Sequence, residues 1–378
     1  MRILIATGVR RKKEAGAAGV VLNHAAELSR RGHAVECWFL EDVLERPVKP
    51  RFEALLFARA VSRRIQKEPG KYDVVNLHAP WGCAYGVGRR WFGARDLPPY
   101  VLTMQGSEEQ YVQAMRLEQR KGRAWNFSWK NRVWQRIYHQ TMYDYSIKTA
   151  DYGAVANREA RVCTELKYKR EPGRISYVPN GTEQRFFISR EFPEKQGLNL
   201  LFVGTWLDRK GIYYLADAFG LLAKKNPEMR LTVAGCAAVD EQVRSLFPTE
   251  VRDRVEVIPF VKREEILGIY QAHDVFVFPS LVEGMPLTLL EAMATAMPAV
   301  TTNTCGMADV VEDEFNGLLV PPADGGRLAA AVQRLRDSAD LRRRLGLAAQ
   351  ETMRRYTWER VTRGLETVLK MAAENGQR

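Results

Sequence analysis

Short apolar runs alternate with helix-period segments along almost the whole chain, and this alternation limits the possible folds more than any other feature. The first run is RILIAT (2–7), a helical pattern covers about 17–31, and VECWFL (35–40) follows it. Because strands that alternate with helical segments are typical of βαβ units, the sequence predicts an α/β protein with parallel sheets. The remaining expected strands are VVNLH (74–78), YVLTMQ (100–105), YGAVAN (152–157), ISYVP (175–179), LNLLFVGT (198–205), LTVAG (231–235), VEVIPF (255–260), VFVFPS (275–280), AVTT (299–302) and GLLV (317–320).

A turn signal divides these strands into two series. The turn VPNG (178–181) precedes a polar stretch, after which a new apolar strand begins at residue 198. The chain has 378 residues, which is long enough for two domains with separate cores. We therefore expect a first Rossmann-like domain over 1–185, a second over 186–355, and a C-terminal helix over 356–378 that can cross back to the first domain.

Basic residues are concentrated in the first half of the chain. Residues 1–185 hold 33 Lys and Arg against 19 Asp and Glu, whereas residues 186–378 hold 24 against 26. A basic domain beside a neutral one predicts an anionic partner, for which nucleic acid, a phospholipid surface and a phosphorylated substrate all qualify. The run Arg10–Lys13 carries this charge into the loop after the first expected strand, where it could hold a phosphorylated acceptor or a headgroup.

The segment 112–148 is dense in Arg, Lys, Trp and Tyr. Within it Trp125, Trp129, Val133 and Ile137 follow one another at four-residue spacing, which predicts one face of a helix. The segment is typical of a basic amphipathic surface on an anionic membrane. The same stripe can instead pack on the sheet of the first domain, with the cations in solvent, and the sequence leaves both interpretations open.

The sequence does not support several other kinds of site or reaction. The five cysteines show no C-x-x-C spacing, so neither a disulfide framework nor a zinc cluster is expected. No G-x-G-x-x-G fingerprint follows the first strand and no Walker A signature occurs, which disfavours hydride transfer and P-loop chemistry. The amino terminus is unlike a signal peptide and no run reaches about 18 apolar residues, so we expect a cytoplasmic protein that can lie on the inner face of a membrane.

Residues 275–298, VFVFPSLVEGMPLTLLEAMATAMP, are the most informative segment. An expected buried strand ends at Pro279, a loop presents Glu283, and Pro286 is placed as the first residue of a helix that carries Glu291. A helix start beside a glycine offers backbone N–H groups to a phosphate or sugar oxygen. Two carboxylates can accept hydrogen bonds from hydroxyls at different points of one ligand.

A second motif, LLFVGTWLDRKGI (200–212), runs from a strand through a glycine turn to Arg209 and Lys210. Arginine can grip a phosphate with two hydrogen bonds and lysine adds a point charge, a pairing that suits a leaving diphosphate. Two solvated cations at a helix start are the plainer alternative. The position at the carboxyl end of the second domain's first strand favours the binding site.

EGMPLTLLEA (283–292) resembles the paired-glutamate signature of retaining glycosyltransferases of family 4, which have the GT-B fold. VGTWLDRKG (203–211) is similar to the strand and basic turn of that family, and YVPNG (177–181) to its inter-domain segment. Similar strings also occur at ADYGAVAN (150–157), AHDVFVFPS (272–280) and NGLLVPP (316–322). The resemblance spans nearly the whole chain and implies an α/β protein of GT-B architecture, two Rossmann-like domains with parallel sheets facing across a deep cleft.

The resemblance also implies roles for individual residues. Glu291 would hold the nucleotide ribose and Glu283 the hydroxyls of the donor sugar, while Arg209 and Lys210 would neutralise the diphosphate as the glycosidic bond breaks. Arg209, Lys210 and Glu283 are thus the expected catalytic residues. Val261 is expected near the base, and Gly16 to Gly19 are expected as a loop close to the donor. The full set of further donor-binding residues is Gly16, Gly19, Gly204, Val261, Gly284, Met285, Pro286 and Leu287.

The chain departs from the family pattern at two positions. Thr205 stands where many relatives have an arginine, and Arg209 can substitute for that cation. Gln105 stands where relatives often have a histidine near the donor sugar, and a glutamine cannot become a cation. His78 is the nearest candidate substitute and can equally be a buried core histidine, so Gln105 and His78 are expected contacts of the donor sugar or the acceptor.

The resemblance and the basic first half together predict a retaining, metal-independent glycosyltransferase. The expected partners are a nucleotide-diphosphate sugar, with UDP as the expected nucleotide, and a lipid-linked or polysaccharide acceptor of cell-envelope or exopolysaccharide synthesis. No cofactor and no metal site is expected, because no convincing D-x-D motif occurs and residues 312–314 are expected as a solvated acidic turn. The alternatives are an inactive homologue that binds sugar nucleotides and a basic nucleic-acid-binding protein, for which no recognisable module occurs.

Overall fold

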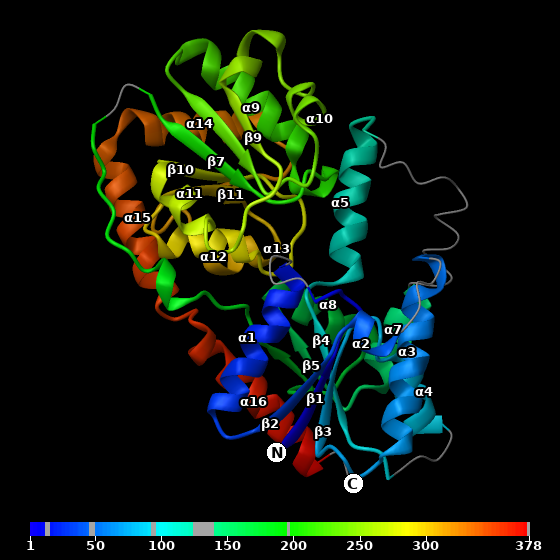
Figure 1. The fold of residues 1–378 in the computed structure, drawn as a ribbon. Coiled ribbons are helices and arrows are strands. Elements are labelled where there is room, and N and C mark those ends of the chain that lie inside the picture. Colours follow the sequence, from blue (N-terminus) through cyan, green and yellow to red (C-terminus); the bar gives the residue numbers. More distant parts are fainter. Residues whose placement is uncertain (12–15, 45–49, 92–95, 124–139, 195–196, 376–378) are drawn as a thin grey trace. The chain divides into compact units, whose positions relative to one another are not determined.

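The computed structural model describes residues 1–11, 16–44, 50–91, 96–123, 140–194 and 197–375. These residues form two compact α/β units (Figure 1). The first unit comprises the described residues within 1–109, 126–180 and 358–378, and the second unit those within 110–125 and 181–357. Each unit is built on a parallel sheet of six strands, which confirms the expected fold class.

The sheet of the first unit has the strand order β2-β1-β3-β4-β5-β6. The central strand β3 is buried along its whole length, because helices cover both faces of a parallel sheet of this kind. The strands are β1 (Arg2–Ala6), β2 (Ala34–Trp38), β3 (Val74–His78), β4 (Tyr100–Met104), β5 (Tyr152–Val155) and β6 (Ile175–Tyr177). The helices are α1 (Gly16–Arg30), α2 (Leu40–Val43), α3 (Pro50–Lys67), α4 (Cys83–Trp91), α7 (Gln140–Thr149), α8 (Arg158–Tyr168) and α16 (Trp358–Asn375).

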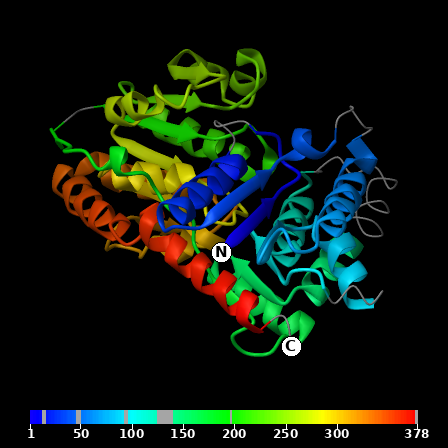
Figure 2. The same cartoon turned by 60° about the horizontal axis from the view of Figure 1, so that its bottom comes forward.

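Two groups of helices cover the two faces of this sheet. On one face α1 and α16 lie side by side, as Figure 2 shows, and Leu28 and Leu365 pack with Ile3 of β1. On the other face α3, α4 and α7 form a second layer, in which Phe57 and Tyr85 pack on the sheet. The apolar surface buried on both faces stabilises the unit.

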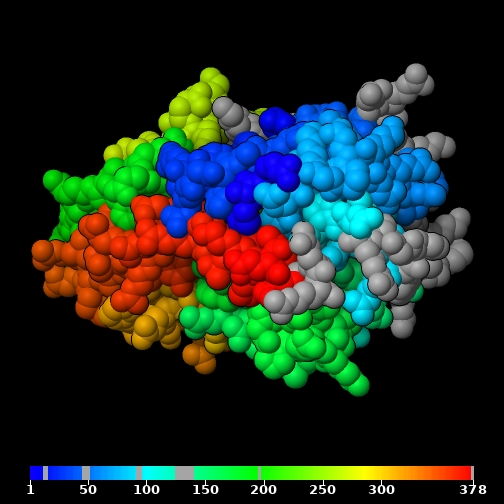
Figure 3. Space-filling view, turned by 90° about the horizontal axis from the view of Figure 1, so that it is seen from below, coloured from blue at the N-terminus to red at the C-terminus, as the bar shows by residue number. Residues whose placement is uncertain are grey.

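The C-terminal helix α16 is anchored in the first unit by a buried carboxylate. Glu366 accepts hydrogen bonds from Arg31, from Nε2 of His33 at 3.1 Å and from Nζ of Lys370 at 2.7 Å. Burial alone would raise the pKa of Glu366, but the hydrogen bonds from Lys370, Arg31 and His33 outweigh it and lower the pKa to about 2. Figure 3 shows the surface of α16, in red, between blue and green residues of the same unit.

The sheet of the second unit has the strand order β12-β11-β10-β7-β8-β9. Its strands are β7 (Asn199–Val203), β8 (Arg230–Ala234), β9 (Val255–Ile258), β10 (Val275–Phe278), β11 (Ala299–Thr302) and β12 (Leu318–Val320). Its longer helices are α9 (Ile212–Lys225), α12 (Leu287–Ala294), α14 (Gly325–Asp337) and α15 (Ala339–Met353). The shorter ones are α10 (Asp240–Arg244), α11 (Ile266–Ala272) and α13 (Cys305–Val310), with the 3-10 turns η2 (Gln184–Phe186), η3 (Asp208–Lys210) and η4 (Thr249–Arg254).

The helix α5 (Glu108–Arg120) differs from the expected domain division, because from Gln110 onward its contacts lie with the second unit. The hydroxyl of Tyr214 donates to buried Glu118, and Lys121 donates to the carbonyl of Ala323. Burial raises the pKa of Glu118. A helix that comes from the first half of the sequence is thus part of the second unit, which the range 1–185 did not anticipate.

The expected strands agree closely with the observed ones. The strands expected at 74–78 and 299–302 are β3 and β11 to the residue, whereas the run 275–280 ends as a strand at Phe278. Pro279 follows at once and has no N–H to donate to a neighbouring strand. No helix among the described residues is long and apolar enough to cross a membrane.

Part of the basic sequence lies outside the described residues. Trp125, Trp129, Val133 and Ile137 fall within 124–139, so both interpretations of the segment 112–148 stay predictions.

Candidate active site

Two loops meet at the carboxyl ends of β7 and β10, which pair in the sheet of the second unit. Gly211 follows η3 in the left-handed conformation, with φ of 71°, and a Cβ there would lie 1.9 Å from the carbonyl oxygen of Pro279. Only glycine therefore allows the turn after β7 to approach the end of β10 so closely. The backbone N–H of Leu281 donates to the carbonyl of Arg209 at 2.8 Å, which fastens the two loops together.

The three expected catalytic residues are brought together between these loops. One oxygen of Glu283, Oε1, lies 2.6 Å from Nζ of Lys210 and 2.9 Å from a guanidinium nitrogen of Arg209. The hydroxyl of Ser280 donates to the same oxygen at 2.9 Å. Burial alone would raise the pKa of Glu283, but the charges of Lys210 and Arg209 outweigh it and hold the pKa below its ordinary value. Glu283 is therefore an ionised, buried carboxylate next to two cations.

Lys210 also lies next to Phe278 and Gly204, at the ends of two strands. Nζ of Lys210 lies 5.0 Å from the ring centre of Phe278, the last residue of β10, a distance typical of a cation–π contact. A Cβ on Gly204 would lie 3.8 Å from the same nitrogen, so Gly204 borders the lysine at the end of β7. Strand ends on both sides thus fix the position of the ammonium group.

The loop Glu283 to Pro286 leads into α12, which begins one residue later than expected. Pro286 is the residue before the helix, with φ of −74° and ψ of 116°, and Leu287 is the first helical residue. The extended ψ of Pro286 is the reason, because a helical residue needs a negative ψ. A Cβ on Gly306 would lie 1.9 Å from the carbonyl oxygen of Gly284, so the start of α13 packs directly against this loop.

Glu291 lies inside α12 and has a different environment. Its carboxylate is buried and accepts a hydrogen bond from the hydroxyl of Tyr270 at 3.0 Å. Burial raises the pKa of Glu291 to about 7, although that hydrogen bond and the charges of Arg263 and Arg185 act in the opposite direction. Both arginines pair with Glu183. Glu291 can therefore change its protonation state near neutral pH.

Val261 follows the end of β9 and is partly exposed. Its neighbour Phe260 is 82% exposed, the largest exposure among the large apolar side chains of the described residues. Because all strands of the sheet are parallel, the carboxyl ends of β7, β9 and β10 lie at the same edge. Val261 therefore lies at the sheet edge that carries Lys210 and Glu283.

In the first unit the expected sugar or acceptor contacts lie at two neighbouring strand ends. His78 is the last residue of β3 and is buried, and burial lowers its pKa to about 4, so the ring is neutral at pH 7. Gln105 directly follows β4, which pairs with β3, and its side-chain oxygen accepts a hydrogen bond from Asn180 at 3.2 Å.

Gly16 and Gly19 do not form a loop, and that expectation is wrong. The helix α1 begins at Gly16, so both glycines belong to its first turn. Helix N-termini offer backbone N–H groups that have no partner within the helix, and the first turn can therefore still face a ligand.

The basic run Arg10–Lys13 is described only as far as Arg11. Arg10 lies 3.6 Å from Glu53, and Arg11 lies 2.7 Å from Asp42. These contacts partly neutralise the two cations expected to hold a phosphorylated acceptor. Lys12 and Lys13 lie outside the described residues.

Residues 184–352 match the family described as glycosyl transferases group 1. We call this matched segment the group 1 domain. Among curated relatives, the UDP-Gal:alpha-D-GlcNAc-diphosphoundecaprenol alpha-1,3-galactosyltransferase of Escherichia coli is 28% identical over 193 residues, which are 48% of this chain and 50% of the relative. The chain spans about half the length of the curated relatives it matches.

Solved structures resemble the chain over both units. The sucrose-phosphate synthase of Thermosynechococcus elongatus has a TM-score of 0.76 at 18% identity and covers 98% of each chain. The Anabaena protein Alr3699/HepE, solved in complex with UDP, has a TM-score of 0.68 at 18% identity and covers 98% of this chain and 100% of its own. These likenesses show that the chain has the GT-B fold.

The group 1 domain contains two site residues that sequence reasoning missed. Ser280 donates a hydrogen bond to Glu283, three residues away in the sequence. Its position at the end of VFVFPS, directly before the loop, could have indicated that it belongs to the site. Tyr270 donates a hydrogen bond to Glu291, which lies 21 residues later in the sequence, and no sequence motif links the two positions. Among the described residues no group of three or more His, Cys, Asp or Glu side chains is arranged to hold a metal ion.

Proposed function

We propose that the chain is a glycosyltransferase that uses a nucleotide-diphosphate sugar, with UDP as the nucleotide. The observation that carries this proposal is the contact of Lys210 and Arg209 with Glu283 inside the group 1 domain. UDP is favoured because the Escherichia coli relative is named for UDP-Gal and the Anabaena structure contains UDP.

The two cations supply the positive charge that a departing diphosphate needs. Lys210 and Arg209 are held beside the carboxylate of Glu283, and from there their positive charge can attract the phosphate oxygens when the donor binds. Positive groups already held in place stabilise the negative charge that develops as the bond breaks. Of the loop residues, Gly284, Met285 and Leu287 have backbone N–H groups that can bind oxygens, and Pro286 has none.

The two glutamates divide the hydroxyl contacts between them. Ionised Glu283 accepts hydrogen bonds from hydroxyls of the donor sugar, and Glu291 accepts them from the ribose. Because the pKa of Glu291 is about 7, its ionised form is fully available only above that pH. A carboxylate accepts hydrogen bonds more strongly than the neutral acid, so donor binding strengthens as the pH rises through 7.

We propose that transfer proceeds with retention of configuration. The bond between the anomeric carbon and the diphosphate oxygen breaks, and a bond to the acceptor oxygen forms on the same face of the sugar. The acceptor proton passes to the leaving diphosphate oxygen, so no side-chain base is needed. Arg209 and Lys210 supply the positive charge in this scheme, and we expect equal rates with and without a chelator of divalent cations.

The acceptor is proposed to be a glycan or a lipid-linked saccharide at an anionic membrane surface. The basic first half of the sequence supports this proposal. His78 and Gln105 are the proposed contacts of the sugar or the acceptor, and both offer neutral hydrogen-bonding groups.

A donor screen tests the proposal. Thermal unfolding of the full chain is followed with UDP-, GDP- and ADP-sugars, and the donor that raises the melting temperature is then supplied with candidate acceptors. We expect a UDP-sugar to stabilise the protein and the product to retain the anomeric configuration by NMR. A screen in which no sugar nucleotide stabilises the chain would refute the proposal.

A further inference from the structure

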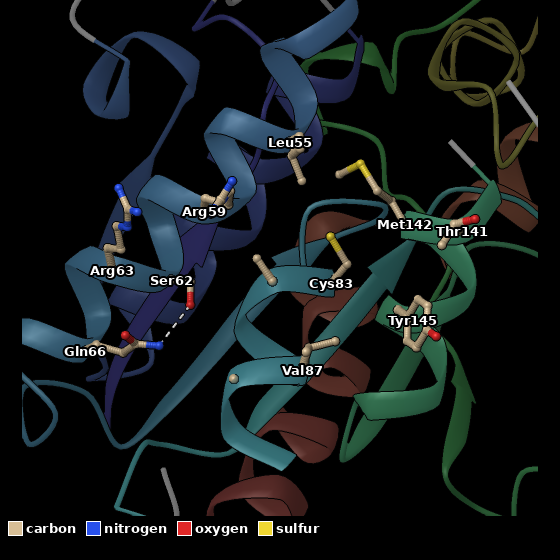
Figure 4. A pocket seen from close by; sticks show the side chains of 12 residues that line it. Leu55, Arg59, Ser62, Arg63, Gln66, Cys83, Val87, Thr141, Met142 and Tyr145 are labelled. Carbon is tan, nitrogen blue, oxygen red and sulfur yellow. Dashed lines mark hydrogen bonds between the residues drawn. The ribbon is translucent and has the colours of Figure 1, made fainter. Parts of the chain in front are cut away.

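A cavity of about 490 Å³ opens between α3, α4 and α7 of the first unit (Figure 4). Ligand sites in proteins have volumes of roughly 300–1,000 Å³, so this cavity is large enough for a small molecule or part of a larger one. None of its lining residues belongs to the candidate active site. The cavity is therefore a feature that the proposed reaction leaves unexplained.

The interior of the cavity is apolar. Figure 4 shows Leu55 of α3 and Met142 of α7 pointing toward one another across it, with Cys83 of α4 nearby. Cys83 and Met142 are buried in a small cluster of their own, against which Leu55 and Tyr145 pack. Methionine adapts its shape to different apolar partners, which suits a flexible chain as a ligand.

A glycine keeps the cavity open. Gly88 lies in α4 and lines the cavity without a side chain. A Cβ there would meet only Nε2 of Gln66, at 3.2 Å, and Oγ of Ser62, at 4.0 Å. The nearest atom is the end of a flexible side chain, so a larger residue at position 88 can be accommodated and would occupy part of the cavity.

Cations border the cavity. Arg59 and Arg63 are exposed, lie one helical turn apart on α3 and form no ion pair among the described residues. Lys148 of α7 is also exposed, and its Nζ lies 5.9 Å from the ring centre of Tyr145, which lines the cavity. No Asp or Glu lines the described part of the cavity. The border is thus complementary to a negative charge.

We propose that this cavity binds one hydrocarbon chain of an anionic phospholipid in a membrane surface, with the lipid phosphate at Arg59 and Arg63. The apolar interior fits the chain and the two arginines fit the headgroup. A lipid chain that enters the cavity removes its apolar walls from water, and the arginines attract the lipid phosphate, so the two contributions act together. The proposal rests on the proposed membrane-surface location of the acceptor, but it does not depend on which donor or acceptor sugar is used.

Vesicle sedimentation of the full chain tests this proposal. Wild-type protein is mixed with vesicles of phosphatidylcholine alone and with vesicles that also contain phosphatidylglycerol, and we expect binding to the second kind. Gly88→Leu places a side chain in the cavity and narrows it, and replacing a helical glycine favours the helix, so this variant should fold. The double variant Arg59→Gln/Arg63→Gln removes the cations. We expect each variant to bind phosphatidylglycerol vesicles at least about fivefold more weakly than wild type.

A matched control separates the cavity from general charge attraction. Arg343→Gln/Arg355→Gln removes two exposed arginines from the second unit and should bind like wild type. The proposal is overturned if wild type binds no better to vesicles with phosphatidylglycerol than to vesicles of phosphatidylcholine alone. It is also overturned if Gly88→Leu binds like wild type, or if the control loses as much vesicle binding as the double variant. It is also overturned if Gly88→Leu converts a dimer to a monomer in light scattering, because a second copy would then cover the cavity.

UDP stabilisation, measured in the same variants, separates the two proposals. Arg59, Arg63 and Gly88 lie in the first unit, and the proposed nucleotide contacts lie in the second. We expect these variants to keep the UDP-induced shift in melting temperature whether or not the vesicle result supports lipid docking.

Discussion

The two units share a six-stranded parallel sheet but present different chemistry at their strand ends. In the second unit the ends of β7 and β10 carry Lys210, Arg209 and Glu283 in direct contact. In the first unit the ends of β3 and β4 carry a neutral His78 and an uncharged Gln105. The sheet fixes where functional groups can lie, whereas the residues that follow each strand decide whether they carry charge.

The same lesson holds for the two glutamates of the second unit. Glu283 and Glu291 are both buried, yet the pKa of Glu283 is lowered and that of Glu291 is raised to about 7. Lys210 and Arg209 compensate the burial of Glu283, while Glu291 has a hydroxyl partner at hydrogen-bonding distance and only more remote arginines. Charge partners thus decide which carboxylate is ionised.

The largest expected effect comes from the charged cluster of the second unit. Glu283→Gln keeps an acceptor for Ser280 but removes the charge that positions Lys210 and Arg209. We expect kcat for sugar transfer to fall by about 100-fold or more. The exposed Glu312→Gln is the control and should leave the rate unchanged. If Glu283→Gln had a near-normal rate, the charged cluster of the second unit would not matter for transfer more than the neutral strand ends of the first unit.

The second prediction concerns Glu291 and the pH dependence of stability. Its folded pKa of about 7 lies above the ordinary value of 4.5, so the folded state loses stability as the pH rises from about 4.5 to 7. Glu291→Gln cannot ionise, so its free energy of unfolding does not fall in this way. Between pH 4.5 and pH 8 we expect its stability relative to wild type to increase by on the order of 2–3 kcal/mol. Urea unfolding at both pH values measures this. A pH-independent difference would contradict the account of Glu291.

The third prediction tests the first unit, where a buried carboxylate has cationic partners as Glu283 does. The pKa of Glu366 is about 2, so its stabilising contribution is full above about pH 4.5 and is lost as the pH falls toward 2. Glu366→Gln should lower the free energy of unfolding at pH 7 by about 1–2 kcal/mol. Glu374→Gln, an exposed position on the same helix, is the control in denaturant titrations. Equal stability of both variants would show that α16 does not depend on this anchor.

The smallest effect is expected at the neutral strand end of the first unit. Because His78 stays neutral above about pH 4, His78→Asn should leave the shape of the pH–rate profile unchanged between about pH 5.5 and 8.5. We expect kcat/KM to change by less than about tenfold, since only a neutral hydrogen bond is altered. Loss of an ionisation near neutral pH in the variant would mean that His78 is a titrating group.

The sequence predicted the strands well and placed Arg209 and Lys210 in the turn after β7, because both depend on local patterns. Buried runs such as VVNLH define β3, and the turn after β7 identifies Arg209 and Lys210. It could not predict which charges pair, since Arg209 meets Glu283 across 74 residues. Contacts over such distances are set by packing of the whole sheet.

Other features of the structure also depended on long-range packing. The assignment of α5 to the second unit rests on the contact of Glu118 with Tyr214, which lies 96 residues away. The raised pKa of Glu291 depends on burial in α12 and on Tyr270, neither of which the motif reveals. The apolar cavity depends on how three helices that are separate in the sequence pack side by side.

The most direct test of the central claim is the affinity of the full chain for UDP, measured by calorimetry for wild type and for Lys210→Ala, with Lys225→Ala as an exposed control. If Lys210 and its partners form the diphosphate site, wild type and Lys225→Ala bind UDP equally, and Lys210→Ala binds at least about tenfold more weakly. Equal affinity of Lys210→Ala and wild type would contradict the account, because the diphosphate would then be held elsewhere.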